Sequence, residues 1–218
     1  MKSNKSVIII GNCPSILLRK NGEKIDSYDI VIRINHCVTD GYEKFIGKKI
    51  NIWATTKINL TKDSFVPKDY HNLLYVWHRT GKTKNISKLP ESLGSNYIMY
   101  KTNNFKKSFG HLINKDTENK WNLKDTNQEF CTGLLTILTS TLFYEDITIT
   151  GFNFYEEQEG NRFLEYYQKD QLDKNGKHYE DKHIEEDKKS GFISSDMRNK
   201  KKKIIEDMES QGLIKILR

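Results

Sequence analysis

The sequence has few of the residues that crosslink or interrupt a chain, with three cysteines and three prolines among 218 residues. Cys13, Cys37 and Cys131 match neither a zinc-ligand spacing nor an even-numbered disulfide framework, so we expect free thiols. No run approaches the roughly 18 apolar residues of a membrane span, and no apolar signal-peptide core is present at the start. These absences predict a cytoplasmic protein.

Several ligand-binding motifs are also missing. The chain contains no P-loop and no Gly-x-Gly-x-x-Gly dinucleotide fingerprint. The acidic run DKHIEEDKK (181–189) matches neither an EF-hand loop nor a His-x-x-x-His zinc helix. We therefore predict neither a metal site nor a bound cofactor.

The formal net charge is +7 at pH 7, and its distribution limits the partners. No nucleic-acid-binding motif accompanies the lysines, and the aromatic residues lie in apolar runs, which argues against a nucleic-acid partner. The positive charge is compatible with an anionic small substrate or with peripheral contact with an anionic membrane surface. The run RNKKKK (198–203) opens a helical pattern and is interpreted as a solvated helix face, with a dedicated binding patch as the alternative.

The order of the apolar segments predicts an α/β protein. Hydrophobic residues make up 36% of the chain, which suffices for a folded core in which Trp53 and Trp77 are expected. Uninterrupted β-branched runs are typical of parallel strands buried on both faces. We predict one Rossmann-like domain over residues 1–218 with a mostly parallel sheet, and a polar loop or lid at about 156–195. The predicted strands are 7–10, 30–35, 49–56, 72–79, 96–102, 147–154 and 213–217, and the longer predicted helices are 131–146 and about 196–211.

The first strand ends abruptly in VIIIGNCPS (7–15), which suggests a ligand site. Gly11 permits a close turn, and Pro14 suits the first turn of a helix. The carboxyl end of such a strand faces the crevice where α/β proteins bind phosphates, and the Asn12 amide offers both a donor and an acceptor. An ordinary turn without a ligand is the alternative. The second strand ends similarly at Asn35, and the adjacent His36 either lines the same crevice or packs at the surface.

Three segments, in order, carry a resemblance to a known family. The first is residues 7–49, with the core Asp-Ser-x-Asp-x-Val-x-Arg-x-Asn at 26–35. The second is 131–154, which opens Cys-Thr-Gly, and the third is KHYED at 177–181. Together they resemble the large, small and third motifs of the eukaryotic-type sialyltransferases, glycosyltransferase family 29, of which this chain would be a short, bacterial or viral-style member.

The resemblance implies a variant GT-A fold and transfer of sialic acid, or a related ulosonic acid, from a CMP-sugar to a hydroxyl of a glycan or glycolipid. Transfer would proceed with inversion and without metal, and no Asp-x-Asp follows a predicted strand. His178 falls where the family meets the leaving phosphate, and the N–H groups of Thr132 and Gly133 at a helix start favour an anion. The implied donor-binding residues are Gly11, Asn12, Cys13, Asn35, Cys131, Thr132, Gly133, Gly151, His178 and Tyr179.

Two positions depart from the family pattern. The histidine that serves as general base, about 17 residues past the third motif, has no counterpart in SSDMRNKKKK (194–203). Asp196 is the nearest group able to take a proton, with an N-cap role as its alternative and His183 as the alternative base. Val7 stands where secreted members place a disulfide cysteine. Transfer from CMP-Kdo and nucleotide binding without transfer are the competing functions.

Overall fold

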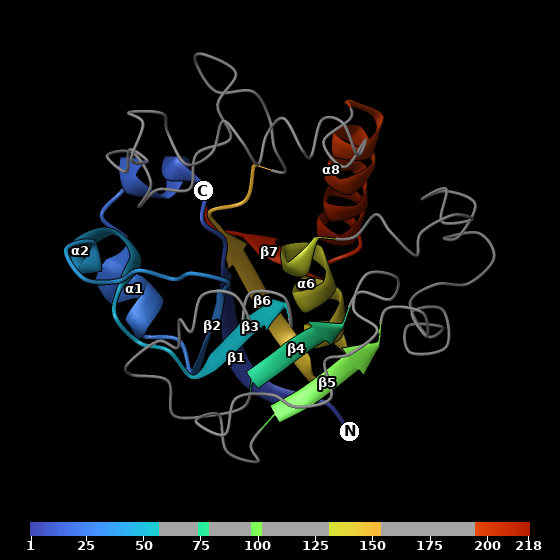
Figure 1. Ribbon diagram of the computed structural model, residues 1–218, viewed down its shortest axis with the longest axis horizontal. Helices are drawn as coiled ribbons and strands as arrows, with labels where there is room; N and C mark the ends of the chain where they lie inside the picture. The colour runs from blue at the N-terminus through green and yellow to red at the C-terminus, as the bar shows by residue number, and fades with distance from the viewer. Residues whose placement is uncertain (57–73, 79–96, 102–130, 154–194) are drawn as a thin grey trace, which may run out of the picture.

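A seven-stranded sheet forms the centre of the protein (Figure 1). The computed structural model describes residues 1–56, 74–78, 97–101, 131–153 and 195–218. The strand order is β5-β4-β3-β2-β1-β6-β7, and every pairing between these strands is parallel. The parallel α/β prediction is therefore confirmed. The strands are β1 (Ser3–Ile10), β2 (Ile30–Ile34), β3 (Ile52–Thr56), β4 (Leu74–His78), β5 (Tyr97–Lys101), β6 (Tyr144–Thr150) and β7 (Lys215–Ile216).

Strand β1 lies between β2 and β6, and this central position explains its apolar run. Residues 7–10 are at most 2% exposed. Val7 and Ile9 face one core of the protein, whereas Ile8 and Ile10 face the other. Because successive side chains of a strand point to opposite faces, a strand covered on both faces needs continuous apolar residues.

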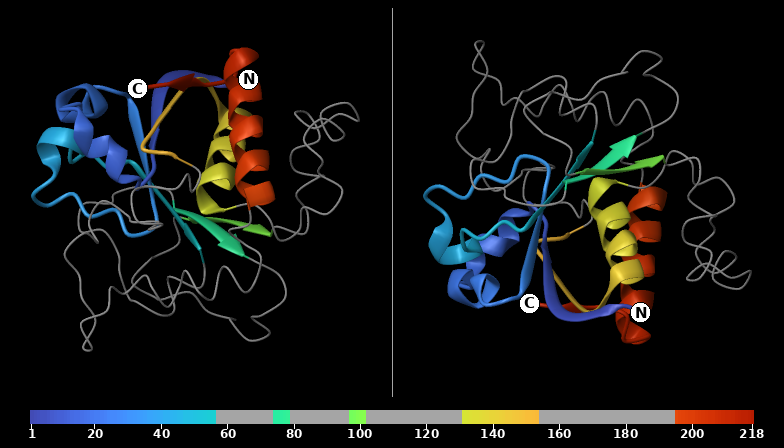
Figure 2. Two further views of the ribbon diagram at one scale, coloured as in Figure 1. Left: turned by 90° about the horizontal axis from the view of Figure 1, so that it is seen from above. Right: turned by 90° about the horizontal axis from the view of Figure 1, so that it is seen from below.

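Helices cover both faces of the sheet (Figure 2). Helices α6 (Thr132–Phe143) and α8 (Ser195–Ser210) pack on the face of Val7 and Ile9. The 3-10 helix η1 (Pro14–Leu18), with α1 (Gly22–Asp26) and α2 (Glu43–Ile46), lies on the other face. Pro14 occupies the start of η1, as predicted. Within the described ranges, no helix has the length and apolar character of a membrane span.

Several strand boundaries differ from the prediction: β3 begins at Ile52 rather than residue 49, β7 covers only Lys215–Ile216, and β1 and β6 both begin earlier than predicted. β1 begins at Ser3 rather than residue 7, and β6 begins at Tyr144 rather than residue 147. The two strands pair from Ser3 opposite Tyr144, so each extends the other beyond its apolar half. Helix α6 accordingly ends at Phe143, and β6 ends at Thr150, before Gly151 turns the chain with a φ of 71°.

The lysine-rich run on α8 is only partly a solvated face. Lys202 and Lys203 are exposed, as expected, but Lys201 is 1% exposed. Lys201 shares the inner face of the helix with Ile204, Ile205 and Met208, all of which are buried. The helical repeat of 3.6 residues places one lysine of any such run on the face that packs against the protein.

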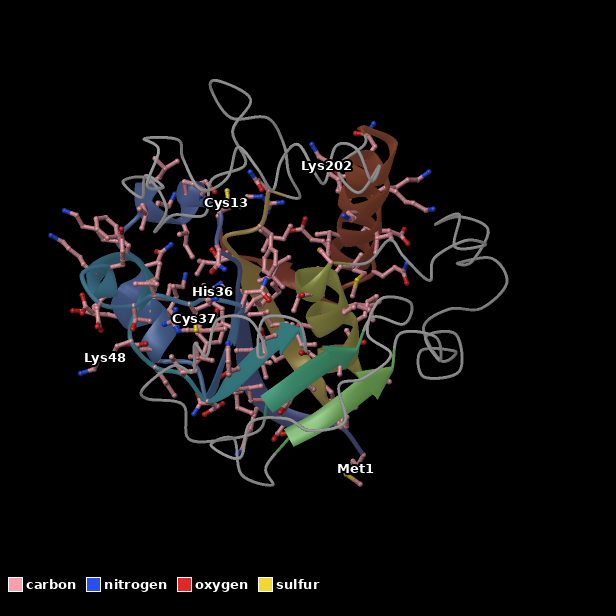
Figure 3. The ribbon with its side chains drawn as sticks, viewed as in Figure 1. Met1, Cys13, His36, Cys37, Lys48 and Lys202 are labelled. Carbon is pink, nitrogen blue, oxygen red and sulfur yellow. The ribbon has the colours of Figure 1, made fainter. Side chains whose placement is uncertain are left out.

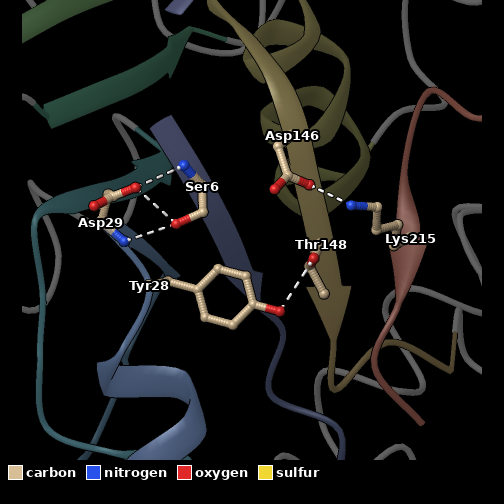
Figure 4. Close-up of polar contacts among 6 residues, drawn as sticks. All are labelled: Ser6, Tyr28, Asp29, Asp146, Thr148 and Lys215. Atoms are coloured by element: carbon tan, nitrogen blue, oxygen red, sulfur yellow. Dashed lines mark hydrogen bonds and ion pairs between the residues drawn. The ribbon is translucent and has the colours of Figure 1, made fainter. Parts of the chain in front are cut away.

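Side-chain hydrogen bonds connect the segment before β2 with β1 and β6 (Figure 4). The Asp29 carboxylate accepts hydrogen bonds from the main-chain N–H and the hydroxyl of Ser6, at 2.9 and 2.8 Å. The Tyr28 hydroxyl lies 3.2 Å from the Thr148 hydroxyl on β6. These contacts join the start of β2 to β1 and to Thr148, which pairs with Ile8 and lies two residues before the end of β6.

Candidate functional site

The strand order reverses beside β1. The chain passes from β1 through β2, β3 and β4 to β5 on one side, and then returns to place β6 on the other side of β1. Helices from the two branches cover opposite faces, so the carboxyl ends of β1 and β6 form a topological switch point. Open α/β sheets bind ligands in the crevice at this position. Gly11 and Gly151 directly follow these two strands.

Gly11 and Gly151 approach each other backbone to backbone. The Gly11 N–H donates to the Thr150 oxygen at 2.9 Å, and the Cys13 N–H donates to the Gly151 oxygen at 3.0 Å. A Cβ on Gly11 would lie 2.2 Å from the Gly151 oxygen. Both glycines are therefore required by the packing of the main chain, and the sequence predicted a close turn at Gly11 but not its contact with Gly151.

Asn12 and Asn35 come together at the same edge. The Asn12 Nδ2 donates to the Ile34 main-chain oxygen at 3.1 Å, which connects the end of β1 to the end of β2. Asn35 has a φ of 53°, in the left-handed region where asparagine is favoured among non-glycine residues. Its N–H donates to the Ala54 oxygen at 2.8 Å, and its oxygen accepts from the Trp53 indole Nε1 at 2.7 Å. Trp53 is 1% exposed, which confirms its predicted place in the core.

Helix α6 begins at Thr132, as the Cys-Thr-Gly pattern predicted. Cys131 occupies the N-cap position in an extended conformation, and its side chain makes no capping hydrogen bond. Because a helix start presents N–H groups and a positive dipole end, an uncapped start favours an anionic group. A Cβ on Gly133 would lie 2.7 Å from the Phe152 ring, and one on Gly11 would lie 3.0 Å from it. Phe152, which the sequence analysis did not select, thus packs beside both segments.

The 26–35 motif serves the fold as well as the site. The Asp26 carboxylate accepts main-chain hydrogen bonds from Lys48 and Lys49 at 2.9 to 3.0 Å. Arg33 is 1% exposed and donates to the main-chain oxygens of Ile46 and Lys49 at 2.7 and 3.0 Å. These two side chains fix the segment between α2 and β3. Asn35, by contrast, lies at the switch-point edge.

All three cysteines are free thiols, as predicted. Cys13 is buried, and its Sγ lies 3.1 Å from the Ser15 hydroxyl. Cys37 is also buried, and loss of hydration raises the pKa of its thiol to about 12, against the opposing charge of Arg33. Figure 3 places Cys13 at the upper end of the central strands and shows Cys37 next to the half-buried His36.

A pocket of about 280 Å³ opens beside the switch point. Residues of η1, Gly151 and Phe152 line it, together with Ile205 of α8 and the β7 end. A second pocket, of about 240 Å³, lies at the amino ends of β6 and β7 and includes Asn4 and Lys215. Of the predicted site residues in the described part of the chain, Gly151 lines the first pocket and none lines the second.

The residues predicted to perform the chemistry are described only in part. His178, Tyr179 and His183, with the predicted lid at 156–195, lie outside the described residues, apart from Ser195 at the start of α8. Asp196 is the second residue of α8, inside its first turn, so it does not occupy the N-cap position considered as its alternative role. Since α8 connects two parallel strands, it runs antiparallel to them and begins at their carboxyl edge. Within the described ranges, no group of three or more His, Cys, Asp or Glu residues is arranged to hold a metal ion.

Known proteins show the same combination of sequence and fold. The model of glycosyltransferase family 29 (sialyltransferase) matches residues 1–188. A human beta-galactoside alpha-2,6-sialyltransferase 2 is 32% identical over 135 residues, which cover 57% of this chain and 25% of that protein. A beta-1,6-galactosyltransferase of Arabidopsis thaliana is 40% identical over 47 residues, which cover 22% of this chain and 12% of that protein. The matched regions thus amount to a quarter or less of these relatives.

The fold agrees with a solved structure. A mammalian sialyltransferase in complex with Gal-beta-1-3GalNAc-ortho-nitrophenol superimposes with a TM-score of 0.52 at 16% identity, covering 99% of this chain and 70% of the other. At this identity the likeness shows a shared fold. Because the family model covers most of the chain, the chain belongs to glycosyltransferase family 29, the sialyltransferase family.

Proposed function

We propose that the protein is an inverting glycosyltransferase that moves sialic acid, or a related ulosonic acid, from a CMP-sugar to a hydroxyl of a glycan. One observation carries this proposal. Asn12 and Asn35, from the first of the quoted segments, and the start of α6, from the second, lie together at the switch point of the sheet. The two amides suit a sugar or base edge, and the uncapped helix start suits the donor phosphate.

The proposed reaction is a single displacement without metal. A general base removes the proton of the acceptor hydroxyl, and its oxygen forms a bond to the anomeric carbon of the donor. The bond from that carbon to the phosphate oxygen breaks, and CMP leaves with the electron pair. Negative charge grows on the phosphate, where main-chain N–H groups at the start of α6 would stabilise it. The variant GT-A description of the fold belongs to the same proposal.

Asp196 is the proposed base. It lies in the first turn of α8, and this turn begins at the edge of the sheet where the donor residues lie. A carboxylate removes a hydroxyl proton effectively if partial burial raises its pKa toward neutrality. Asp196→Asn should abolish turnover with little loss of stability, and His183→Asn is the matched test of the alternative. Full activity of the Asp196 variant beside an inactive His183 variant would assign the base to His183.

His178 is proposed to stabilise the leaving phosphate. A charge-assisted hydrogen bond that strengthens in the transition state contributes to kcat rather than to ground-state binding. We expect His178→Ala to lower kcat by about 10²-fold, with a smaller change in the KM for the donor. An unchanged kcat would remove His178 from the reaction.

A donor panel tests the proposed function as a whole. CMP should raise the melting temperature without added metal, whereas UDP and GDP should raise it much less, because a ligand that binds the native state stabilises it. Mass spectrometry of a mixed glycan acceptor, incubated with CMP-sialic acid, CMP-Kdo or a UDP-hexose, would identify the donor. The galactosyltransferase relative makes the UDP-sugar arm necessary. Stabilisation by UDP but not CMP, with transfer of a hexose, would contradict the proposal.

Two further outcomes bear on the remaining alternatives. CMP binding without product from any acceptor would favour a nucleotide-binding protein that has lost transferase activity.

The free cysteines fit a reducing compartment, so the cytoplasm is the proposed location. Fractionation of cells that express the protein, with and without a salt wash of the membranes, would separate a cytoplasmic protein from one bound peripherally to an anionic surface.

A further inference from the structure

The side chain of Phe152 contacts two segments of the candidate donor site. Phe152 follows the turn at Gly151 after β6, and it is half-buried against the core that α6 covers. A Cβ on Gly133, in the first turn of α6, would lie 2.7 Å from the Phe152 Cε1, and a Cβ on Gly11, after β1, would lie 3.0 Å from the Cδ1. The same edge of the ring therefore packs against two residues that have no side chain.

The main chain next to Phe152 is fixed to the turn after β1. The Cys13 N–H donates to the Gly151 oxygen at 3.0 Å, and the Gly11 N–H donates to the Thr150 oxygen at 2.9 Å. These main-chain bonds hold the end of β6, and with it the backbone of Phe152, against the end of β1. The ring then extends from this fixed backbone to α6.

The first turn of α6 also meets the end of β2. The Ile34 Cδ1 would lie 3.7 Å from a Cβ on Gly133, which is an ordinary van der Waals distance, and the Ile34 oxygen accepts the hydrogen bond from the Asn12 side chain. Close-packed interiors transmit the loss of one side chain to its neighbours. Removal of the Phe152 ring would therefore let the start of α6 shift with respect to Asn12.

We propose that Phe152 is a positioning residue for the donor, because its ring sets the distance between the turn after β1 and the start of α6. This inference rests on the proposed function, in which Asn12 and the N–H groups at the start of α6 bind different parts of one CMP-sugar. Hydrogen bonds weaken steeply when their angles depart from linearity, so such a ligand loses affinity when the two segments are misaligned. Phe152 acts through Gly11 and Gly133, and this role needs no contact between its ring and the donor.

A double-mutant cycle without ligand tests the packing. Gly133→Ala should lower the melting temperature of the wild type, because the new Cβ would lie 2.7 Å from the ring. In a Phe152→Leu background the same change should not lower it, because leucine has no atom at the Cε1 position and alanine favours a helix more than glycine does. Equal losses in the two backgrounds would show that the ring does not set this distance, and would overturn the inference.

Ligand binding tests the positioning role itself. Calorimetric titration should show that Phe152→Leu raises the Kd for CMP about tenfold, the scale of one hydrogen bond to a charged group. The Kd for cytidine should change less, because cytidine lacks the phosphate. Tyr144→Leu is the matched control, since Tyr144 is also a half-buried aromatic residue packed on the same core, at the opposite end of β6. It should lower the melting temperature and leave both Kd values unchanged.

The outcomes separate a positioning role from a structural one. A wild-type Kd for CMP in Phe152→Leu, or an equal rise in Tyr144→Leu, would show that Phe152 only supports the fold. Equal rises for CMP and cytidine would also overturn the inference, because the loss would not depend on the phosphate. If the wild type itself binds no CMP, the proposed function fails and this inference fails with it. Wild-type CMP binding that does not depend on Phe152 would leave the proposed function standing.

Discussion

Gly11 and Gly151 lie at the carboxyl ends of two paired strands, so close that a methyl group on Gly11 would lie 2.2 Å from the Gly151 oxygen. The contact joins the two halves of the sheet at the point where the chain reverses its direction of strand addition. A side chain on either glycine would clash with the main chain of the other, so both are needed for β1 and β6 to end side by side. The shape of the candidate donor crevice therefore depends on two residues without side chains.

Gly151→Ala tests this contact, and Gly212→Ala is its matched control. Both glycines have positive φ, at 71° and 68°, so both variants incur the left-handed penalty of about 1–2 kcal/mol. A Cβ on Gly151 would also meet the Gly11 oxygen at 2.6 Å, whereas one on Gly212 would meet no atom within 4 Å. We expect urea unfolding to show an additional loss of about 1–3 kcal/mol for Gly151→Ala. Equal losses in the two variants would contradict the importance of the close approach.

Trp53 should act as a positioning residue for Asn35. Its indole N–H holds the main-chain oxygen of Asn35, whose φ is positive. Trp53→Phe removes this hydrogen bond, and we expect the Kd for CMP to rise roughly fivefold, which corresponds to about 1 kcal/mol. Ser6→Ala is the control, because it removes the side-chain hydrogen bond to Asp29 before the start of β2 and should leave the Kd unchanged.

A double-mutant cycle makes the Trp53 prediction specific. In an Asn35→Gly background the main chain reaches positive φ without assistance, and the amide is already absent. Trp53→Phe should then have no further effect on the Kd for CMP. An additional loss of the same size in both backgrounds would show that Trp53 acts on the site independently of Asn35.

The three thiols should react in a fixed order in the native protein. Cys131 is half-buried at the start of α6, whereas Cys13 and Cys37 are 7% and 4% exposed. Burial raises the pKa of the Cys37 thiol to about 12, so almost no thiolate is present at pH 8. Mass spectrometry after timed iodoacetamide treatment should show Cys131 modified first and Cys37 modified only in urea, and CMP should slow the reaction of Cys131. Rapid native alkylation of Cys37 would contradict the structure.

Asp29 should contribute to the loss of unfolding free energy at acid pH. Hydrogen bonds from the Ser6 side chain, and then from the Ser6 N–H, lower the pKa of Asp29 below its usual 3.8. A lowered carboxyl pKa contributes stability above pH 3.8 that is lost as the pH falls through the folded-state value. Asp29→Asn should therefore make the decline of unfolding free energy below about pH 4 shallower, as measured by urea midpoints. Ser6→Ala should reduce the slope in part, and parallel curves for the variants and wild type would refute the assignment.

The sequence predicted three boundaries at the site well, although it extended β6 to residue 154, past its end at Thr150. Gly11, Asn35 and Thr132 each mark a boundary by local chemistry: a required glycine, a left-handed asparagine and a helix start. The starts of β1 and β6 were predicted too late, because the polar residues there join the sheet through their pairing with each other. No local signal specifies a partner that lies so far along the chain.

The inward position of Lys201 and the Trp53–Asn35 contact were also missed. Which lysine of RNKKKK faces inward depends on how α8 is rotated against the sheet, and Ile204, Ile205 and Met208 fix that rotation. The 3.6-residue repeat of these apolar residues indicates that Lys201 faces inward. The neighbouring lysines nevertheless favoured the interpretation of the whole run as an exposed face. The Trp53–Asn35 bond joins two strands, and its geometry follows from their register.

The central position of β1 also affects the order in which its two strand pairings form during folding. Val7 pairs with Ile30 nearby in the chain, but its pairing with Ile147 must wait until the long intervening chain has been brought together. Closure of such a loop is entropically costly, and contacts distant in sequence slow folding. The pairing of β1 with β2 is therefore expected to form before the pairing of β1 with β6, so the turn after β1 and the start of α6 come together late in folding. A ligand that requires both segments then leaves the folding rate unchanged and slows unfolding, so it would act on the lifetime of the native protein.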